Sequence, residues 1–358
     1  MSAKPAISVV MPSYNHGRYV DACIKGFLAQ SFQNFELIII DDASSDDNVE
    51  QIRRFQDSRI RFLSRQANRG VAAGMNEGFR MAKADLICFF ATDDLPEPGY
   101  LEAALRGFDT NPAAVGVYFP LRKIGESGES LGGRVSLPSG AGHRELLRRS
   151  FMGGNQLPSP GMAVRRSVAV EALLPEGVSQ YSDWMLNNRL LMRGEVVLSD
   201  APMVAYRVAA GSLSGRSDAA IGREAAETRL MMDDFLSLRT IDQLRDVFGK
   251  EMEEFAGLSD AHVPYVLGRL ALRSDHHEKR CWGYETIMRH LSTPGVAESL
   301  AACAGFTYKD FMAAVPRPHG SPVKEINDLR RRLRRQRIIS VILGIGLVAA
   351  IALWLAAR

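Results

Sequence analysis

Residues 86–94 read LICFFATDD, an apolar run that ends in the adjacent carboxylates Asp93 and Asp94. An upstream run repeats this arrangement, because residues 35–42 read FELIIIDD. Two carboxylates at the end of a buried strand are costly to desolvate unless a positive charge lies beside them. In open α/β sheets the ligand crevice lies at the carboxyl ends of the strands. The two acidic pairs therefore predict a site for a hard cation and a phosphorylated ligand, whereas capping of the following helices would suit a single Asp better.

The surrounding sequence alternates strand and helix patterns at short intervals. The expected strands are residues 7–11, 35–40, 60–63, 86–90 and 115–119. The expected helices between them are residues 19–29, 47–56, 71–82 and 98–108. This rhythm predicts an α/β fold whose mainly parallel sheet is flanked by helices on both faces.

The pattern is less regular further along the chain. Two loops rich in small residues are expected at 125–142 and 152–161, and loops of this length are more often functional than idle. A helix at 183–193 and short strands at 196–198 and 203–206 are expected next. Residues 216–314 have a helical composition and no motif that indicates a role.

Charge is distributed unevenly along the 358 residues, which include 44 basic and 41 acidic side chains. Eight of the basic and two of the acidic residues lie from Lys324 onward, so the preceding body has a small acidic excess and no feature of a nucleic-acid binder. The four cysteines show no disulfide or metal spacing. The N-terminus lacks the apolar stretch of a secretion signal, which predicts a body in the cytoplasm.

The last twenty residues before Arg358 differ from the rest, because residues 338–357 contain only Ser340 as a polar side chain. As a helix they would span about 30 Å, the thickness of a bilayer core. The basic stretch 330–337 precedes them, which predicts a single-pass membrane protein with its body on the cytoplasmic side and arginines near anionic lipids. Residues 315–337 read as a linker and juxtamembrane segment. A buried core helix is the alternative.

Two segments allow a family to be named. Residues 7–15 read ISVVMPSYN, and residues 30–46 read QSFQNFELIIIDDASSD. With the later motifs around Gly70 and Asp94, the sequence over about residues 5–215 resembles family-2 glycosyltransferases of the GT-A fold. The resemblance implies an inverting transfer of a sugar from a nucleotide-sugar, a UDP-sugar first among them, to a glycan or lipid-linked acceptor.

The first of these segments supplies the expected nucleotide contacts. Pro12 ends a strand, and Ser13 and Tyr14 form a turn whose backbone and aromatic ring can hold a base. Asp42 follows the next strand and can accept the imide N–H of uracil. By resemblance, Asp42 is the base-reading residue, while turn capping is the better interpretation of Asp41.

The strand-end pair occupies the family's metal motif, usually written Asp-x-Asp. The resemblance implies that Asp94 ligates Mn²⁺ or Mg²⁺ and that Asp93 contacts the ribose or the metal. A divalent ion there would neutralise the leaving diphosphate. This chain departs from the commonest form, since Ala91 stands in place of the first carboxylate.

Two later motifs complete the expected site. Asp183 occupies the family's position for the catalytic base, with Ser182 in place of the usual Glu; without the resemblance, a helix cap would be the preferred interpretation. Arg207 resembles the closing arginine and could pair with the diphosphate. Ala209 stands where many relatives have His.

The departures at Ala91, Ser182 and Ala209 motivate a different hypothesis, a non-catalytic glycosyltransferase-like scaffold. A dinucleotide-binding oxidoreductase would share the sheet, but the spacing of Gly70 and Gly74 is not that of its glycine fingerprint. The expected organisation is a GT-A glycosyltransferase domain at 1–215, a helical region at 216–314, the linker at 315–337 and a transmembrane helix at 338–357.

Overall fold

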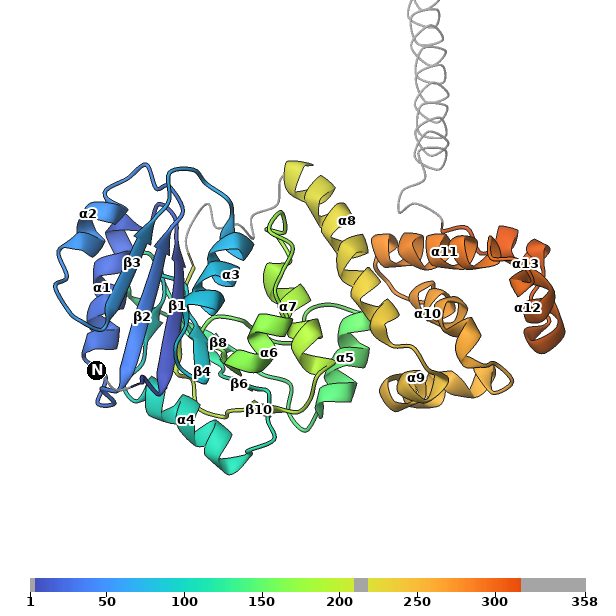
Figure 1. Ribbon diagram of the computed structural model, residues 1–358, viewed down its shortest axis with the longest axis horizontal. Helices are drawn as coiled ribbons and strands as arrows, with labels where there is room; N and C mark the ends of the chain where they lie inside the picture. The colour runs from blue at the N-terminus through green and yellow to red at the C-terminus, as the bar shows by residue number, and fades with distance from the viewer. Residues whose placement is uncertain (1–3, 209–217, 317–358) are drawn as a thin grey trace, which may run out of the picture.

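The computed structural model describes residues 4–208 and 218–316 and has a seven-stranded sheet in its first part (Figure 1). In spatial order the strands are β10 (Val196–Leu198), β6 (Gly116–Tyr118), β9 (Ala163–Arg165), β4 (Leu86–Phe89), β1 (Ile7–Ser13), β2 (Phe35–Asp41) and β3 (Ile60–Ser64). Every pairing is parallel except those of β9 with β4 and β6. The α/β class and the mainly parallel sheet are confirmed. The antiparallel β9 was not predicted, because three residues are too short to show a strand period.

Helices cover both faces of this sheet because alternate side chains of each strand point to opposite sides. One face packs against α3 (Val71–Met81), and the other against α1 (Gly17–Leu28) and α4 (Tyr100–Thr110), as Figure 1 shows. In β1, Val10 belongs to the first core and Val9 to the second. The α3 helix lies so close to β1 that a Cβ added to Gly78 would sit 2.2 Å from Val10 Cγ1, so tight packing explains this glycine.

A smaller four-stranded sheet lies beside the first, in the order β5 (Leu95–Pro96), β11 (Val204–Arg207), β7 (Leu121–Ile124) and β8 (Ser130–Val135). The prediction of a loop throughout residues 125–142 was therefore wrong. Gly132 and Gly133 have φ angles of +69° and +72°, which disfavour a regular strand locally. Antiparallel pairing with β7 nevertheless forms the ladder, with a register shift between Arg122 and Ile124. Residues 153–161 contain neither helix nor strand.

Shorter helices connect these strands. They are α2 (Asn48–Arg53), α5 (His143–Met152), α6 (Arg166–Glu171) and α7 (Ser182–Leu191). The predicted helix at 183–193 thus begins and ends one or two residues earlier than expected. The α7 helix matters most for function, because Asp183 lies in its first turn.

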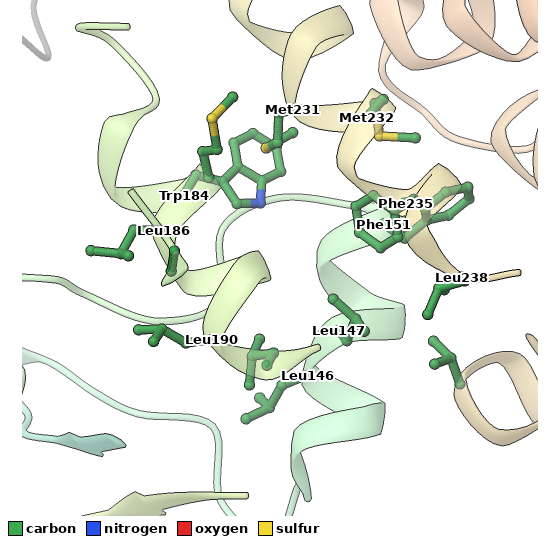
Figure 2. Close-up of a cluster of buried hydrophobic side chains, with 14 of the residues drawn as sticks. Leu146, Leu147, Phe151, Trp184, Leu186, Leu190, Met231, Met232, Phe235 and Leu238 are labelled. Atoms are coloured by element: carbon green, nitrogen blue, oxygen red, sulfur yellow. The ribbon is translucent and has the colours of Figure 1, made fainter. Parts of the chain in front are cut away.

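The second part of the described chain is helical, as its composition predicted. Its main helices are α8 (Asp218–Asp233), α9 (Ile241–Phe248), α10 (Val263–Ala271), α11 (His277–Leu291), α12 (Val296–Ala304) and α13 (Tyr308–Ala313). They lie beside α5 and α7, away from β1–β3 (Figure 1). A continuous apolar core joins the two parts, since Phe151 and Trp184 share one buried cluster with Met231, Met232 and Phe235 (Figure 2).

Residues 4–208 and 218–316 contain no helix that is both long and apolar enough to cross a membrane. The predicted membrane helix at 338–357 and most of the segment 315–337 lie outside these described residues.

Candidate active site

The carboxyl ends of β1, β2 and β4 meet at one edge of the sheet, since these strands are parallel neighbours. Pro12 and Ser13 end β1, Asp42 follows β2, and the Asp93–Asp94 pair follows β4. The structure therefore brings the predicted nucleotide and metal residues together. Ser13 Oγ connects the start of α2 with the turn after β4, because it donates to Asn48 Oδ1 at 3.1 Å and accepts from Thr92 Oγ1 at 2.8 Å.

Asp94 is a buried carboxyl group with one partnered and one unpartnered oxygen. Its Oδ1 accepts a 2.8 Å hydrogen bond from the backbone N–H of Arg207. Its Oδ2 is buried and has no hydrogen-bond partner within the described ranges. Burial, and then the charge of Asp93, raise the pKa of Asp94 well above its usual value. A cation at Oδ2 would offset both effects, so the chemistry of this group fits a metal ligand.

Other candidate ligands around Asp94 are fewer than the family motif provides. In residues 4–208 and 218–316, no three side chains of the His, Cys, Asp or Glu type are already arranged as a metal centre. Cys23 donates to the Ala91 carbonyl at 3.8 Å, and burial raises the pKa of its thiol. Asp93 and Asp94 are the acids that would hold Mn²⁺ or Mg²⁺, together with phosphate oxygens of a donor.

Arg207 holds the backbone of the metal motif in place through hydrogen bonds. Its Nε donates to the Asp93 carbonyl at 2.7 Å, and its Nη1 donates to the carbonyls of Gly125 and Glu126 at 2.8 and 2.7 Å. The guanidinium also lies 4.5 Å from the centroid of the Tyr19 ring. Two of its three nitrogens are thus held by the protein, and the contact with a diphosphate stays a prediction.

The carboxylate of Asp42, which follows β2, accepts several hydrogen bonds. Its Oδ1 accepts from Arg65 Nη1 at 2.9 Å and from the Arg69 N–H at 3.0 Å, and its Oδ2 accepts from the Gly70 N–H at 2.7 Å. A carboxylate offers about four acceptor positions, so three bonds leave one for a ligand. Ala43 follows at φ +62°, a conformation that costs free energy outside glycine and is commonest at functional sites.

Tyr14 and Asp41, which lie near these residues, differ in exposure and in partners. The Tyr14 side chain is exposed, as a base-stacking ring would require. Asp41 is fully buried, and its two oxygens accept from Asn48 Nδ2 and the Ser44 N–H. The preference for a turn-capping Asp41 is confirmed by these contacts.

Asp183 lies at the start of α7 with its carboxylate in a short hydrogen-bonded network. Oδ1 accepts from the Trp184 N–H at 2.6 Å, and Oδ2 accepts from Asn155 Nδ2 at 3.1 Å. Burial raises the pKa of Asp183 to about 6, while these hydrogen bonds lower it. Asp183 is not the N-cap residue of α7, since Tyr181 occupies that position. A carboxylate with this pKa can accept a proton near neutral pH.

Asn155 and Asn187 connect Asp183 to the sheet. Tyr118, the last residue of β6, donates to Asn187 Oδ1 at 2.9 Å, and Asn187 Nδ2 donates to Asn155 Oδ1 at 3.2 Å. Since β6 is parallel to β4, this series of hydrogen bonds places Asp183 at the edge of the sheet that carries Asp94. The sequence had marked residues 152–161 as a functional loop, but nothing in it singled out Asn155.

The helical region holds both loops that flank Asp183. Glu227 of α8 accepts from the backbone N–H groups of Ser179 and Tyr181 at 2.9 and 2.7 Å. Lys279 of α11 is fully buried, and its ammonium group donates to the carbonyls of Ser150 and Gly153 at 2.6 and 2.5 Å. Neither residue was predicted, because no motif in residues 216–314 indicates that α8 and α11 contact this site.

The chain is similar to known glycosyltransferases in sequence. Residues 8–174 match the model of Glycosyl transferase family 2. The UDP-Glc:alpha-D-GlcNAc-diphosphoundecaprenol beta-1,3-glucosyltransferase WfgD of Escherichia coli is 36% identical over 89 residues, which are 25% of this chain and 35% of that protein. The chain matches 37–56% of the length of the first three curated relatives.

Two solved structures are similar in fold at low sequence identity. S. aureus TarS 1-349 in complex with UDP-GlcNAc has a TM-score of 0.53 at 16% identity and covers 83% of each chain. Mannosyltransferase PcManGT from Pyrobaculum calidifontis, in complex with GDP-Man and Mn²⁺, has a TM-score of 0.51 at 15% identity and covers 87% of this chain and 83% of that one. Residues 8–174 are therefore similar to the glycosyltransferases of family 2, and the fold is similar to those of these two proteins.

Proposed function

We propose that this protein is an inverting, metal-dependent glycosyltransferase that moves a sugar from a nucleotide-sugar to a glycan or lipid-linked acceptor. One observation carries the proposal: two carboxyl groups suited to the reaction lie at the same edge of the sheet. Asp94 has a buried oxygen without a partner among the described residues, which suits a cation, and Asp183 has a pKa that allows it to accept a proton. A non-catalytic scaffold would need neither an unpartnered buried carboxylate oxygen nor a carboxyl group whose pKa is near 6.

The proposed reaction is a single displacement. The acceptor oxygen attacks the anomeric carbon, the bond from that carbon to the diphosphate breaks, and the nucleoside diphosphate leaves with the electron pair. Asp183 takes the hydroxyl proton of the acceptor as the new bond forms. A divalent cation, when bound, neutralises charge that develops on the leaving diphosphate. Asn155 holds the carboxylate of Asp183 in place, and Arg207 fixes the backbone that carries Asp93.

A uridine donor is the best-supported choice. Asp42 keeps one acceptor position for an imide N–H, and the exposed Tyr14 ring lies two residues beyond Pro12 for stacking. Complexes of TarS with UDP-GlcNAc and the UDP-Glc donor named for WfgD are consistent with this choice.

The acceptor side of the proposal depends on the sequence beyond the described residues. The basic stretch 330–337 and the apolar stretch 338–357 would anchor the chain in a membrane, with residues 1–215 and 216–314 in the cytoplasm. Membrane lipids would then contact the arginines. A lipid-linked acceptor would be within reach, as the diphosphoundecaprenol in the name of WfgD suggests for that relative.

A donor screen tests the proposal. We expect the purified protein, in detergent, to release a nucleoside diphosphate from one nucleotide-sugar in the presence of Mn²⁺ or Mg²⁺. Asp94→Asn removes the charge at nearly constant volume, and it should lower this rate by about 100-fold or more. Asp109→Asn, a surface change on α4, is the matched control and should leave the rate unchanged. If calorimetry with metal present detects binding of no nucleotide-sugar, the enzyme proposal is wrong and the scaffold hypothesis gains.

Activity should depend on pH through Asp183. The protein raises the pKa of this carboxyl from 3.8 to about 6, so the ionised base is lost as the pH falls through that value. We expect log kcat/KM to rise with a slope of about one below pH 6 and to level off above it. Asn155→Ala removes a hydrogen bond to the carboxylate and should move the midpoint upward. Rates of both proteins measured from about pH 5 to about pH 9 check the midpoint of the parent and its change in the variant. A rate that does not depend on pH would exclude Asp183 as the base.

A further inference from the structure

His16 contacts the turn that carries the acidic pair, although nothing in the sequence marked it. It lies between β1 and α1, and its Nδ1 is 2.8 Å from Thr92 Oγ1. Its Nε2 is 3.8 Å from Asp93 Oδ2. The side chains of His16 and Asp93 are 27% and 25% exposed, so an ion can reach both from solvent.

The hydrogen bonds that connect Thr92, the partner of His16, to Asp41 have donors and acceptors that can be assigned. The carboxylate of Asp41 can only accept, so the amide nitrogen of Asn48 faces it at 2.7 Å. The amide oxygen of Asn48 therefore faces Ser13 Oγ and accepts the Ser13 proton at 3.1 Å. Ser13 in turn accepts the single hydroxyl proton of Thr92 at 2.8 Å.

This assignment decides which nitrogen of His16 is protonated. Because Thr92 has given its proton to Ser13, Thr92 Oγ1 can only accept from the imidazole, and Nδ1 carries the ring proton. In the neutral ring Nε2 then has a lone pair, and this nitrogen is the one beside Asp93. Metal-binding histidines commonly donate their second ring N–H in this way, which fixes the tautomer and the ring orientation.

We propose that His16 Nε2 is a metal ligand of the strand-end site, where it acts with Asp93 and Asp94. The inference rests on the proposed function, because the cation is the one that the transferase would use. Metal–ligand bonds of about 2.0–2.2 Å allow two atoms 3.8 Å apart to share one ion. The buried, unpartnered Oδ2 of Asp94 is a further acceptor for that ion. His16 would thus supply a donor atom that Ala91 does not provide.

A nitrogen ligand has a consequence for metal preference. Mg²⁺ prefers oxygen ligands, whereas affinity for sites with imidazole rises from Mn²⁺ to Co²⁺. The site should therefore prefer Co²⁺ and Mn²⁺ to Mg²⁺, and the preference should depend on residue 16.

The test uses His16→Asn, which keeps an amide N–H to donate to Thr92 but removes the atom beside Asp93. We expect the full-length protein with UDP to bind Co²⁺ at least about 10-fold more weakly after this change, and Mg²⁺ less than about threefold more weakly. Pulsed electron paramagnetic resonance of bound Mn²⁺ should show coupling to a directly bound ¹⁴N nucleus that His16→Asn abolishes. His143→Asn is the matched control, since His143 pairs with Glu195. It should leave both readouts unchanged.

Two results would overturn the inference. Mn²⁺ that binds without ¹⁴N coupling in the unaltered protein would show that His16 is not a ligand, while the transferase proposal would stand. If neither Mn²⁺ nor Co²⁺ binds in the presence of UDP, the inference also fails. Calorimetry with UDP alone then decides whether the nucleotide site fails with it.

Discussion

Asp183→Asn is expected to lower kcat by about 10²–10⁴-fold, the contribution that a positioned general base usually makes. The amide has nearly the same size and can keep a hydrogen bond from the Trp184 N–H, but it cannot take a proton from the acceptor. KM for the donor should change little, because the proposed donor contacts lie around Asp42 and Asp94. Steady-state rates of nucleoside diphosphate release, with acceptor present, measure the effect.

The stability of this variant separates chemistry from folding. The carboxylate of Asp183 has a pKa raised by burial, so the ionised form is the less favourable one in the folded state. Between about pH 4 and pH 6 the folded protein binds more protons than the unfolded chain, and the free energy of unfolding falls as the pH rises through this window. Asp183→Asn removes that cost, so its melting temperature should equal or exceed that of the parent. A variant with full turnover would refute Asp183 as the base and leave the nucleotide site untouched.

The strand-end part of the site was predictable because it depends on local pattern. An apolar run followed by two acids indicates a buried strand and its carboxyl end, and parallel neighbours bring such ends together. This reasoning placed Asp42 and Asp94 at one edge, as the structure does. It could not assign His16, whose proposed role depends on a chain of hydrogen bonds, and it did not predict that backbone carbonyls accept from Nε and Nη1 of Arg207.

Tertiary contacts decide the rest. The β8 strand forms despite two glycines with positive φ, because β7 offers a partner that no local propensity reveals. In the sequence, Asn155 is one polar residue in a loop. In the structure, the hydrogen bond from Asn187 fixes the orientation of its amide. The helical region likewise gave no motif, because its contribution is made by single buried side chains that reach across to α5 and α7.

Lys279 is the clearest of these side chains. It satisfies carbonyls at the end of α5, where a helix has unpaired acceptors and a negative partial charge. Ser150 and Phe151 belong to that last turn, and Gly153 follows it. The ammonium group also lies 4.5 Å from the Trp184 ring centroid, beside Asp183. Burial lowers the pKa of Lys279 to about 7, while these partners favour its charged form.

Lys279→Met is therefore expected to disturb folding and the site together. Methionine fills a similar volume but leaves three carbonyls without a donor, which should lower the free energy of unfolding by about 2–4 kcal/mol. The backbone from Gly153 to Asn155 should also shift, and a displacement near 1 Å at a catalytic group can cost about 100-fold in rate. Denaturant unfolding and kcat below the melting transition measure the two effects. The exposed Lys250→Met is the matched control and should alter neither.

Asn155→Ala separates the two effects of Lys279, because it removes the contact with Asp183 and leaves the α5 carbonyls paired. If Lys279 acts on Asp183 through this loop, both variants should move the midpoint of the pH profile upward from about 6, and only Lys279→Met should lower stability strongly. A Lys279→Met protein that loses stability but keeps the parent midpoint and kcat would confine Lys279 to a structural role. The helical region would then contribute to the fold and not to the geometry of the base.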